Sequence, residues 1–177
     1  MKILIIGASG AGTTTLGQTL AQHTSYTHLD VDNYYWKPTK PSFQEKMPLA
    51  KRNQKLTADF NCLPKVIVSG SLISWGNEWL QAFDLVVFLY LPQKTRMERL
   101  RQREIQRHGE ALHTHALIRQ TSQAFLEWAA QYDDPNFTGR SLAVHQQWLQ
   151  KLACPVLRLK GAIELEQKVI KVMALME

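Results

Sequence analysis

A chain of 177 residues, 45% of them hydrophobic, is predicted to form a single domain spanning residues 1–177. Its longest apolar run, Leu85–Leu91, is far shorter than the roughly 20 residues of a membrane-spanning helix, so no membrane partner is expected. The net charge of +6 suits an anionic ligand, either a small phosphate compound or a nucleic acid. Cys62 and Cys154 lack metal-ligand spacing and are predicted to be reduced thiols of a cytoplasmic protein.

Short apolar runs alternate with helical periodicity along the whole chain. The apolar runs predict five buried strands, which in chain order are KILIIG, HLDVD, KVIVSG, DLVVFLYLP and PVLRLKG. The segments between and after them predict helices at about residues 14–23, 43–60, 94–107, 115–132 and 141–152, and from residue 165 onward. Near-continuous apolar strands separated by helices indicate an α/β fold in which helices cover both faces of a parallel sheet.

The first strand runs into the stretch GASGAGTTT, Gly7–Thr15, which matches most of the phosphate-binding pattern G-x-x-x-x-G-K-[ST]. Gly7 and Gly12 occupy the two glycine positions, and Thr14 occupies the hydroxyl position. Backbone N–H groups of such a loop bind phosphate at the start of a helix without needing a side chain. Phosphate binding is therefore expected, and the alternative is a tight turn in which the glycines serve geometry alone.

The lysine position of this pattern holds Thr13, which offers only a hydroxyl group. The lysine normally brings positive charge to the β- and γ-phosphates, so phosphoryl transfer is expected to be slow unless another cation replaces it. One face of the helix after Pro92 collects the arginines at positions 96, 99, 103 and 107. Like charges at this spacing destabilise a helix, which makes the face a candidate anion site. The alternative is a solvated basic face, partly offset by Glu98 and Glu104.

Pro92 is followed by Arg99 and Arg103 at offsets of seven and eleven residues, and PVLRLKG precedes the last helix. In these features and in its loop, the chain resembles the P-loop kinases of the adenylate kinase and shikimate kinase group. It resembles most closely the adenylate-kinase-like bacterial proteins in which the P-loop lysine is replaced. The resemblance implies a three-layer P-loop NTPase fold with five parallel strands. It also implies an acceptor-side helical segment at about residues 33–62 and a helical lid at about residues 100–122.

The resemblance also implies roles for individual residues. The nucleotide would contact Gly7, Ser9, Gly10, Ala11, Gly12, Thr13, Thr14, Thr15 and Arg99. Asp32, Arg99 and Arg103 would be catalytic, and Thr14 and Asp30 would hold Mg²⁺. Adenylate kinases carry Asp-Gly after the third strand, where this chain has Ser69 and Gly70, so Asp30 and Asp32 are the remaining carboxylate candidates. The alternative for both is turn formation and helix capping.

The sequence therefore predicts an ATP-dependent, Mg²⁺-using kinase of a nucleotide or another small molecule. The alternative is a nucleotide-binding regulator with little or no phosphoryl transfer. A nucleic acid partner is not favoured, because no recognised nucleic-acid motif accompanies the charge. Ser71 and Trp75 are expected at the ligand edge, and YDDPNFTGR is interpreted as a surface turn. Asn33–Trp36 is expected to pack beneath the substrate helix rather than to stack on a ligand ring. The acceptor, the choice between ATP and GTP, and the choice between monomer and homodimer stay open.

Overall fold

A computed structural model describes residues 1–39 and 43–176 of the chain. Its centre is one five-stranded sheet with the order β2-β3-β1-β4-β5, in which every neighbouring pair is parallel. The strands are β1 (Lys2–Gly7), β2 (Thr27–Asp30), β3 (Val66–Ser69), β4 (Leu85–Tyr90) and β5 (Val156–Lys160). The predicted α/β fold class with a five-stranded parallel sheet is confirmed.

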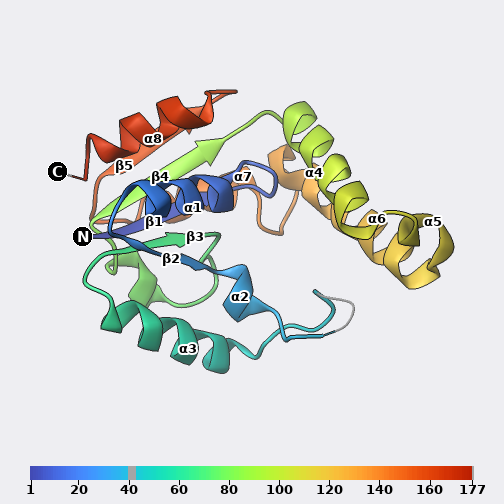
Figure 1. The fold of residues 1–177 in the computed structure, drawn as a ribbon, viewed down its shortest axis with the longest axis horizontal. Helices are drawn as coiled ribbons and strands as arrows, with labels where there is room; N and C mark the ends of the chain where they lie inside the picture. The colour runs from blue at the N-terminus through green and yellow to red at the C-terminus, as the bar shows by residue number, and fades with distance from the viewer. Residues whose placement is uncertain (40–42, 177) are drawn as a thin grey trace.

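Helices connect successive strands and flank the sheet (Figure 1). They are α1 (Thr13–His23), α2 (Asp32–Tyr35), α3 (Leu49–Cys62), α4 (Gln93–His108), α5 (Ala111–Thr114), α6 (Ala116–Ala130), α7 (Leu142–Leu149) and α8 (Leu165–Met173), with two short 3₁₀ helices, η1 (Asn77–Leu80) and η2 (Gln131–Asp133). Helices α4 and α6 run side by side away from the sheet, and α5 joins their far ends (Figure 1).

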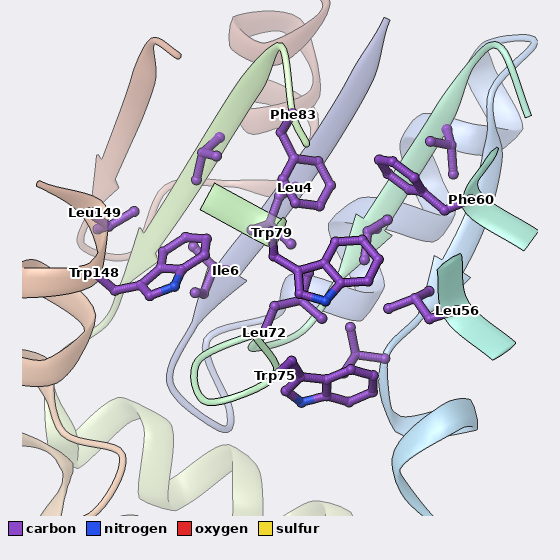
Figure 2. Close-up of a cluster of buried hydrophobic side chains, with 14 of the residues drawn as sticks. Leu4, Ile6, Leu56, Phe60, Leu72, Trp75, Trp79, Phe83, Trp148 and Leu149 are labelled. Atoms are coloured by element: carbon purple, nitrogen blue, oxygen red, sulfur yellow. The ribbon is translucent and has the colours of Figure 1, made fainter. Parts of the chain in front are cut away.

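The alternation of side chains along the central strand divides the core into two layers. Ile3 and Ile5 of β1 face the apolar sides of α1 and α8. Leu4 and Ile6 face the opposite cluster, which is built from α3, η1 and α7 (Figure 2). Three tryptophans contribute to this second layer: Trp75, Trp79 and Trp148. Both faces of the sheet are therefore covered, as the continuous apolar strands require.

Two predicted boundaries are wrong. The helix expected from residue 43 begins at Leu49, because Pro48 at its N-cap lacks an N–H group and disfavours helical backbone in the preceding residue. The stretch before it instead forms an antiparallel bridge between Lys46 and Trp36. The second strand ends at Asp30 rather than Asp32, because Asp30 Oδ1 accepts a hydrogen bond from the Asp32 N–H group at the start of α2.

The proposed acceptor-side segment, 33–62, includes residues 40–42, which lie outside the described residues. The remainder of that segment forms most of α2 and all of α3, and the proposed lid at 100–122 covers the outer part of the α4–α5–α6 projection. None of the helices in the described ranges is both long enough and apolar enough to cross a membrane.

The indole of Trp79 is the centre of the aromatic packing between η1 and α3. It is 2% exposed, its ring stacks on Phe83 at 6.1 Å between centroids, and its Nε1 donates to Asn53 Oδ1 at 3.0 Å. We expect Trp79→Ala to lower the free energy of unfolding by about 3–5 kcal/mol, since it leaves a cavity and an unpaired amide oxygen. Urea denaturation measures this loss. Leu117→Ala, at an exposed position of α6, is the control and should stay within about 0.5 kcal/mol of wild type.

Candidate functional site

The glycine-rich loop adopts a backbone that only glycine takes without strain. Gly10 and Gly12 have φ angles of 82° and 94°, in the left-handed region. Gly12 is the N-cap of α1, and no side chain caps this helix end. A Cβ atom added at Gly12 would meet only Arg99 Nη1, at 3.9 Å, among the described atoms. The N–H groups of the first turn therefore face open space, as a phosphate cradle requires.

The loop opens into a cleft of ≈ 1110 Å³. The cleft is lined by nearly all of the predicted site residues: Gly7, Ser9, Gly10, Gly12, Thr13, Thr14, Thr15, Asp30, Asp32, Arg99 and Arg103. Ala11 is the exception, since it is buried in the core beneath the loop. The fold thus brings together residues from the ends of β1 and β2 with residues of α4.

Asp30 connects the loop to the start of α2. Its Oδ2 accepts a hydrogen bond from Thr14 Oγ1 at 2.9 Å, while its Oδ1 accepts from the Asp32 N–H group. A hydroxyl and a carboxylate side by side at a phosphate cradle fit Mg²⁺, which often takes only one or two carboxylates from a protein. No group of three or more His, Cys, Asp or Glu side chains suited to a metal ion occurs in the described ranges.

Asp32 lies beside this pair and is accessible from the cleft. Limited hydration inside the cleft raises the pKa of its carboxyl group, and the negative charge of Asp30 raises it further. The positive charges of Arg140, Arg103 and Arg107 act in the opposite direction on this pKa. The Asp32 carboxylate is therefore a stronger base than an ordinary aspartate, and it lies within the electrostatic influence of the cationic wall of the cleft.

Helix α4 contributes this cationic wall. Arg99 and Arg103 both line the cleft with exposed side chains, and the Arg103 guanidinium lies 5.5 Å from the centre of the Phe125 ring. The surrounding cleft walls limit the hydration of the Arg103 guanidinium, which lowers its pKa. The neighbouring charge of Arg107 lowers this pKa further. These repelling cations are the like-charge face that the sequence predicted.

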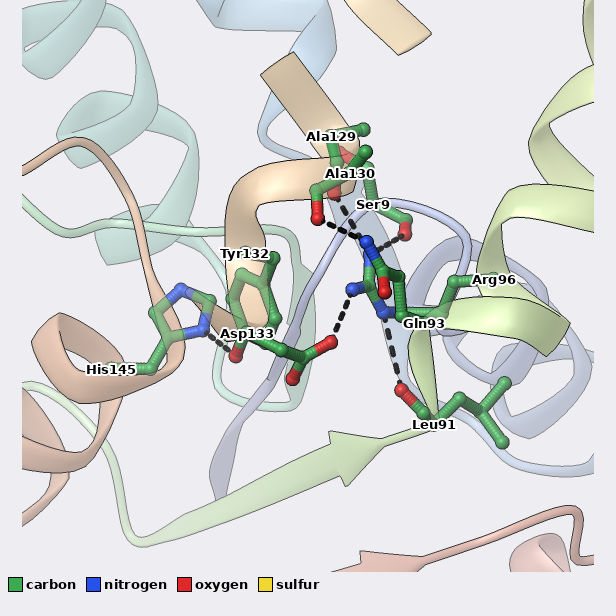
Figure 3. Close-up of polar contacts among 9 residues, drawn as sticks. All are labelled: Ser9, Leu91, Gln93, Arg96, Ala129, Ala130, Tyr132, Asp133 and His145. Atoms are coloured by element: carbon green, nitrogen blue, oxygen red, sulfur yellow. Dashed lines mark hydrogen bonds and ion pairs between the residues drawn. The ribbon is translucent and has the colours of Figure 1, made fainter. Parts of the chain in front are cut away.

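Arg96 does not belong to that anion-binding face, which corrects the sequence interpretation. Its side chain is 0% exposed, and its Nε donates to the carbonyl oxygen of Leu91 at 3.1 Å (Figure 3). Its Nη1 lies 3.2 Å from the Ala129 carbonyl oxygen and 3.5 Å from that of Ser9 in the loop. Its Nη2 forms an ion pair with Asp133 at 2.7 Å. This arginine therefore ties the loop, the end of β4 and the end of α6 to α4.

Two arginines of the cleft were not predicted from the sequence. Arg52 of α3 packs against the neighbouring rings of Tyr35 and Trp75, at 4.5 Å and 4.7 Å from their centres. Its Nε is buried and has no hydrogen-bond partner among the described residues. A guanidinium that packs on two aromatic rings and forms no ion pair within the described residues is suited to bind an anion. Within α3 it stands among other charged residues, so the sequence carried no signal for it.

The second missed arginine is Arg140, in the stretch interpreted as a surface turn. That interpretation holds for the exposed turn at Asp134 but is wrong for the two ends of the stretch, because Arg140 lines the cleft and Asp133 is the partner of Arg96. Burial lowers the pKa of Arg140, and the attraction of Asp32 opposes this shift. Its guanidinium lies 5.0 Å from the centre of the Trp128 ring. Arg140 comes close to Asp32 only because the chain returns from α6 to the edge of the sheet, which the sequence does not reveal.

A buried histidine supports the floor of the cleft. His145 of α7 is 0% exposed, and its Nδ1 and Nε2 form hydrogen bonds with Tyr132 Oη at 2.6 Å and Ser71 Oγ at 3.3 Å. Burial, reinforced by the charge of Arg140, lowers the pKa of His145 to about 3, so the ring is neutral at physiological pH. Ser71 itself lines the cleft, as do Trp75, Tyr35 and Trp36. The expectation that Asn33–Trp36 only packs is therefore too narrow.

The sheet order, the uncapped glycine loop and the cationic helix beyond β4 give the chain the fold of the P-loop kinases of the adenylate kinase and shikimate kinase group. The chain belongs to the AAA domain family, whose model matches residues 3–114.

Three known proteins illustrate the relationship. The uncharacterized protein YqaC of Bacillus subtilis (strain 168) is 42% identical over 172 residues, which are 97% of this chain and 95% of that protein. The shikimate kinase of Neisseria meningitidis serogroup C (strain 053442) is 29% identical over 110 residues, 56% of this chain and 65% of that protein. The structure of deoxyadenosine kinase from M. mycoides with bound dATP is similar in fold, with a TM-score of 0.58, 16% identity and 99% of each chain covered.

The role of Arg96 can be tested through stability. We expect Arg96→Met to lower the free energy of unfolding by about 3 kcal/mol, because it leaves three carbonyl groups and one carboxylate without this donor. Arg96→Lys should lose nearly as much, since one ammonium group cannot reach all four acceptors. Arg101→Met, at an exposed position of the same helix, is the control. Equal stability of the Arg96 and Arg101 variants in urea denaturation would contradict a structural role for Arg96.

Proposed function

We propose that this protein is a nucleoside-triphosphate-dependent kinase that transfers the γ-phosphoryl group to a small acceptor bearing an anionic group. The observation that carries the proposal is the uncapped N-terminus of α1, which opens into the same cleft as Asp32 and several arginines. Membership of the AAA domain family and the kinase-like fold support a nucleotide as donor. The relative from Neisseria, a shikimate kinase, supports a small molecule as acceptor.

On the donor side, the N–H groups at Gly12–Thr14 would bind the phosphates, and ATP or GTP fits this role equally. Thr14 and Asp30 would hold Mg²⁺, whose oxygen ligands are already adjacent at 2.9 Å. When bound, this ion offsets part of the phosphate charge. Arg99 would flank the nucleotide, because its Nη1 already extends over Gly12.

On the acceptor side, Arg52 and Arg140 would bind the anionic group, and Asp32 would orient the acceptor hydroxyl. The hydroxyl oxygen would attack the γ-phosphorus, and the bond from that phosphorus to the β-phosphate oxygen would break. The hydroxyl proton would pass to the Asp32 carboxylate. The raised pKa of this carboxyl group favours acceptance of the proton.

Arg103 would neutralise the negative charge that develops on the transferred phosphoryl group. Thr13, at the lysine position of the loop, is uncharged and cannot do this. Asp32 and Arg103 influence each other electrostatically, which supports a common position at the reacting end of the cleft. Together with Arg99, this arginine would make the α4 face part of the catalytic apparatus, and the α4–α5–α6 projection would act as a lid.

One observation favours a second candidate function, a nucleotide-binding regulator without phosphoryl transfer. It is the presence of Thr13 at the lysine position. Both candidates share the nucleotide site, and they differ only in whether the acceptor end of the cleft is used.

The deciding experiment combines purified protein with Mg²⁺, γ-labelled ATP or GTP, and a panel of hydroxylated carboxylic acids, nucleoside monophosphates and neutral nucleosides. A labelled product from an anionic acceptor, formed faster than nucleotide hydrolysis, would support the kinase. Nucleotide binding without any labelled product would support the regulator. Failure of both nucleotides to bind would overturn both.

We expect Asp32→Asn to lower kcat by about a hundredfold or more while the Kd for nucleotide changes less than about threefold, because the amide cannot accept the proton. In the wild type, kcat should fall on acidification at a pH above the usual range of an aspartate, because protonation removes the base and its pKa is raised. Asp134→Asn, in an exposed turn, provides the matched control. An equal loss of nucleotide affinity and turnover would contradict the assigned role.

We expect Arg103→Met to reduce kcat by about 10²–10³-fold, the usual consequence of removing one donor that stabilises transition-state charge. Arg101→Met removes a cation from the same helix but outside the cleft, and should leave kcat within about twofold of wild type. Steady-state kinetics at saturating nucleotide makes the comparison. If both variants lose the same small amount, the net charge of α4 and not Arg103 itself would be responsible.

A further inference from the structure

Lys168 of α8 is a buried cation that none of the steps above uses. Its side chain is 7% exposed, yet it lines the cleft together with Thr13, Thr15 and Arg99. Helix α8 packs directly against α1 on the same face of the sheet (Figure 1). The sequence offered no signal for Lys168, because it is one of two lysines in an ordinary amphipathic helix.

The positive charge of Lys168 has no ion-pair partner among the described residues. No ion pair and no side-chain hydrogen bond of its ammonium group occurs within residues 1–39 and 43–176. Burial lowers the pKa of Lys168, the charge of Arg99 lowers it further, and the weaker attraction of Glu164 opposes these effects. Burying a cation beside another cation is unfavourable without an anion nearby. The ammonium group is therefore available to an anionic ligand that enters the cleft.

The position of Lys168 indicates which part of that ligand it would meet. Lys168 lines the cleft together with Thr13 at the start of α1, and α8 packs against α1. The Arg99 guanidinium extends over Gly12 and its charge acts on Lys168, so both cations face the cleft near the uncapped helix start. One helical turn before Lys168, the cleft wall is formed by the apolar side chains of Ile163 and Leu165, a surface suited to a nucleobase. Lys168 follows this apolar stretch along the chain, so a nucleotide with its base on that wall and its phosphates on the loop would bring its base-side phosphates toward Lys168.

We propose that Lys168 replaces the absent loop lysine by binding the non-transferred phosphates of the nucleotide, a role that rests on the proposed nucleotide site. The ammonium group donates hydrogen bonds to phosphate oxygens from the side of α8, while Arg99 approaches from α4. In this arrangement the positive charge missing at Thr13 is supplied by two helices. Lys168 determines nucleotide affinity, whereas Arg103 acts on the transferred group.

The test compares Lys168→Met, which keeps the length of the side chain but removes its charge, with Lys171→Met, an exposed position on the same helix. Isothermal titration with ATP, ADP and adenosine at constant Mg²⁺ measures affinity. We expect Lys168→Met to weaken ATP and ADP binding by about tenfold to a hundredfold, typical of losing a hydrogen bond between charged groups, with adenosine changed less than twofold. The Lys171 variant should match wild type for all three ligands.

Thermal unfolding of the ligand-free protein separates this role from a structural one. An uncompensated buried charge destabilises the fold, so the melting temperature of Lys168→Met should equal or exceed that of wild type. A lower melting temperature would mean that the ammonium group has a structural partner, and would overturn the proposal. An equal loss of affinity for adenosine would place Lys168 at the base or ribose and would overturn it as well.

Restoring the loop lysine gives an independent test. Thr13→Lys should recover more ATP affinity in the Lys168→Met background than it adds in the wild-type background, because the two lysines would serve the same phosphates. A double-mutant cycle measures this coupling. Additive effects would overturn the proposal.

The outcomes also separate the proposal from the function on which it rests. If wild type binds ATP and GTP and Lys168→Met binds them equally well, only the role of Lys168 fails. If wild type binds neither nucleotide, the proposed function fails and the role of Lys168 fails with it. A phosphate-selective loss without transfer to any acceptor would support Lys168 and favour the regulator over the kinase.

Discussion

The buried guanidinium of Arg96 is the interaction on which the geometry of the cleft depends. It joins three backbone carbonyls and the Asp133 carboxylate, which come from the loop, the end of β4, the end of α6 and the following turn. A guanidinium suits this position because its planar donors remain charged and reach several acceptors at once. Because Arg96 lies in the first turn of α4, it sets the direction of this helix. Arg99 and Arg103, further along the same helix, are thereby directed toward the cleft.

A second constraint is the edge of the parallel sheet. The carboxyl ends of β1 and β2 place the glycine loop next to Asp30, and the hydrogen bond from Thr14 fixes their relative position. The N-terminus of α1 is left without a side-chain cap, so its amide groups need an external acceptor. These two features together fit the sheet edge to the phosphate compound that we propose as its ligand, independently of any charged side chain in the loop.

Threonine in place of the loop lysine, at Thr13, therefore changes where the positive charge of the cleft is located. It does not remove the backbone groups of the loop that face the cleft. A single lysine in the loop would move with α1, whereas cations on α4 and α8 belong to separate elements of the fold. Arg99 and Lys168 repel each other, and an anion bound between them would relieve this repulsion. Under the proposed function, nucleotide affinity would depend on how α4 and α8 are held, and the buried contacts of Arg96 support α4.

The sequence alone determined the sheet, the loop and the residues nearest to it, since apolar runs, glycine spacing and proline positions act locally. It also indicated Arg99 and Arg103 through their helical spacing. Only the tertiary structure decided which arginine of that face is buried, because Arg96 meets its acceptors across separations of 33 and 87 residues. Arg140 and Lys168 were hidden for the same reason. Each is an ordinary charged residue in its own segment, and it becomes part of the cleft only where the folded chain brings distant elements together.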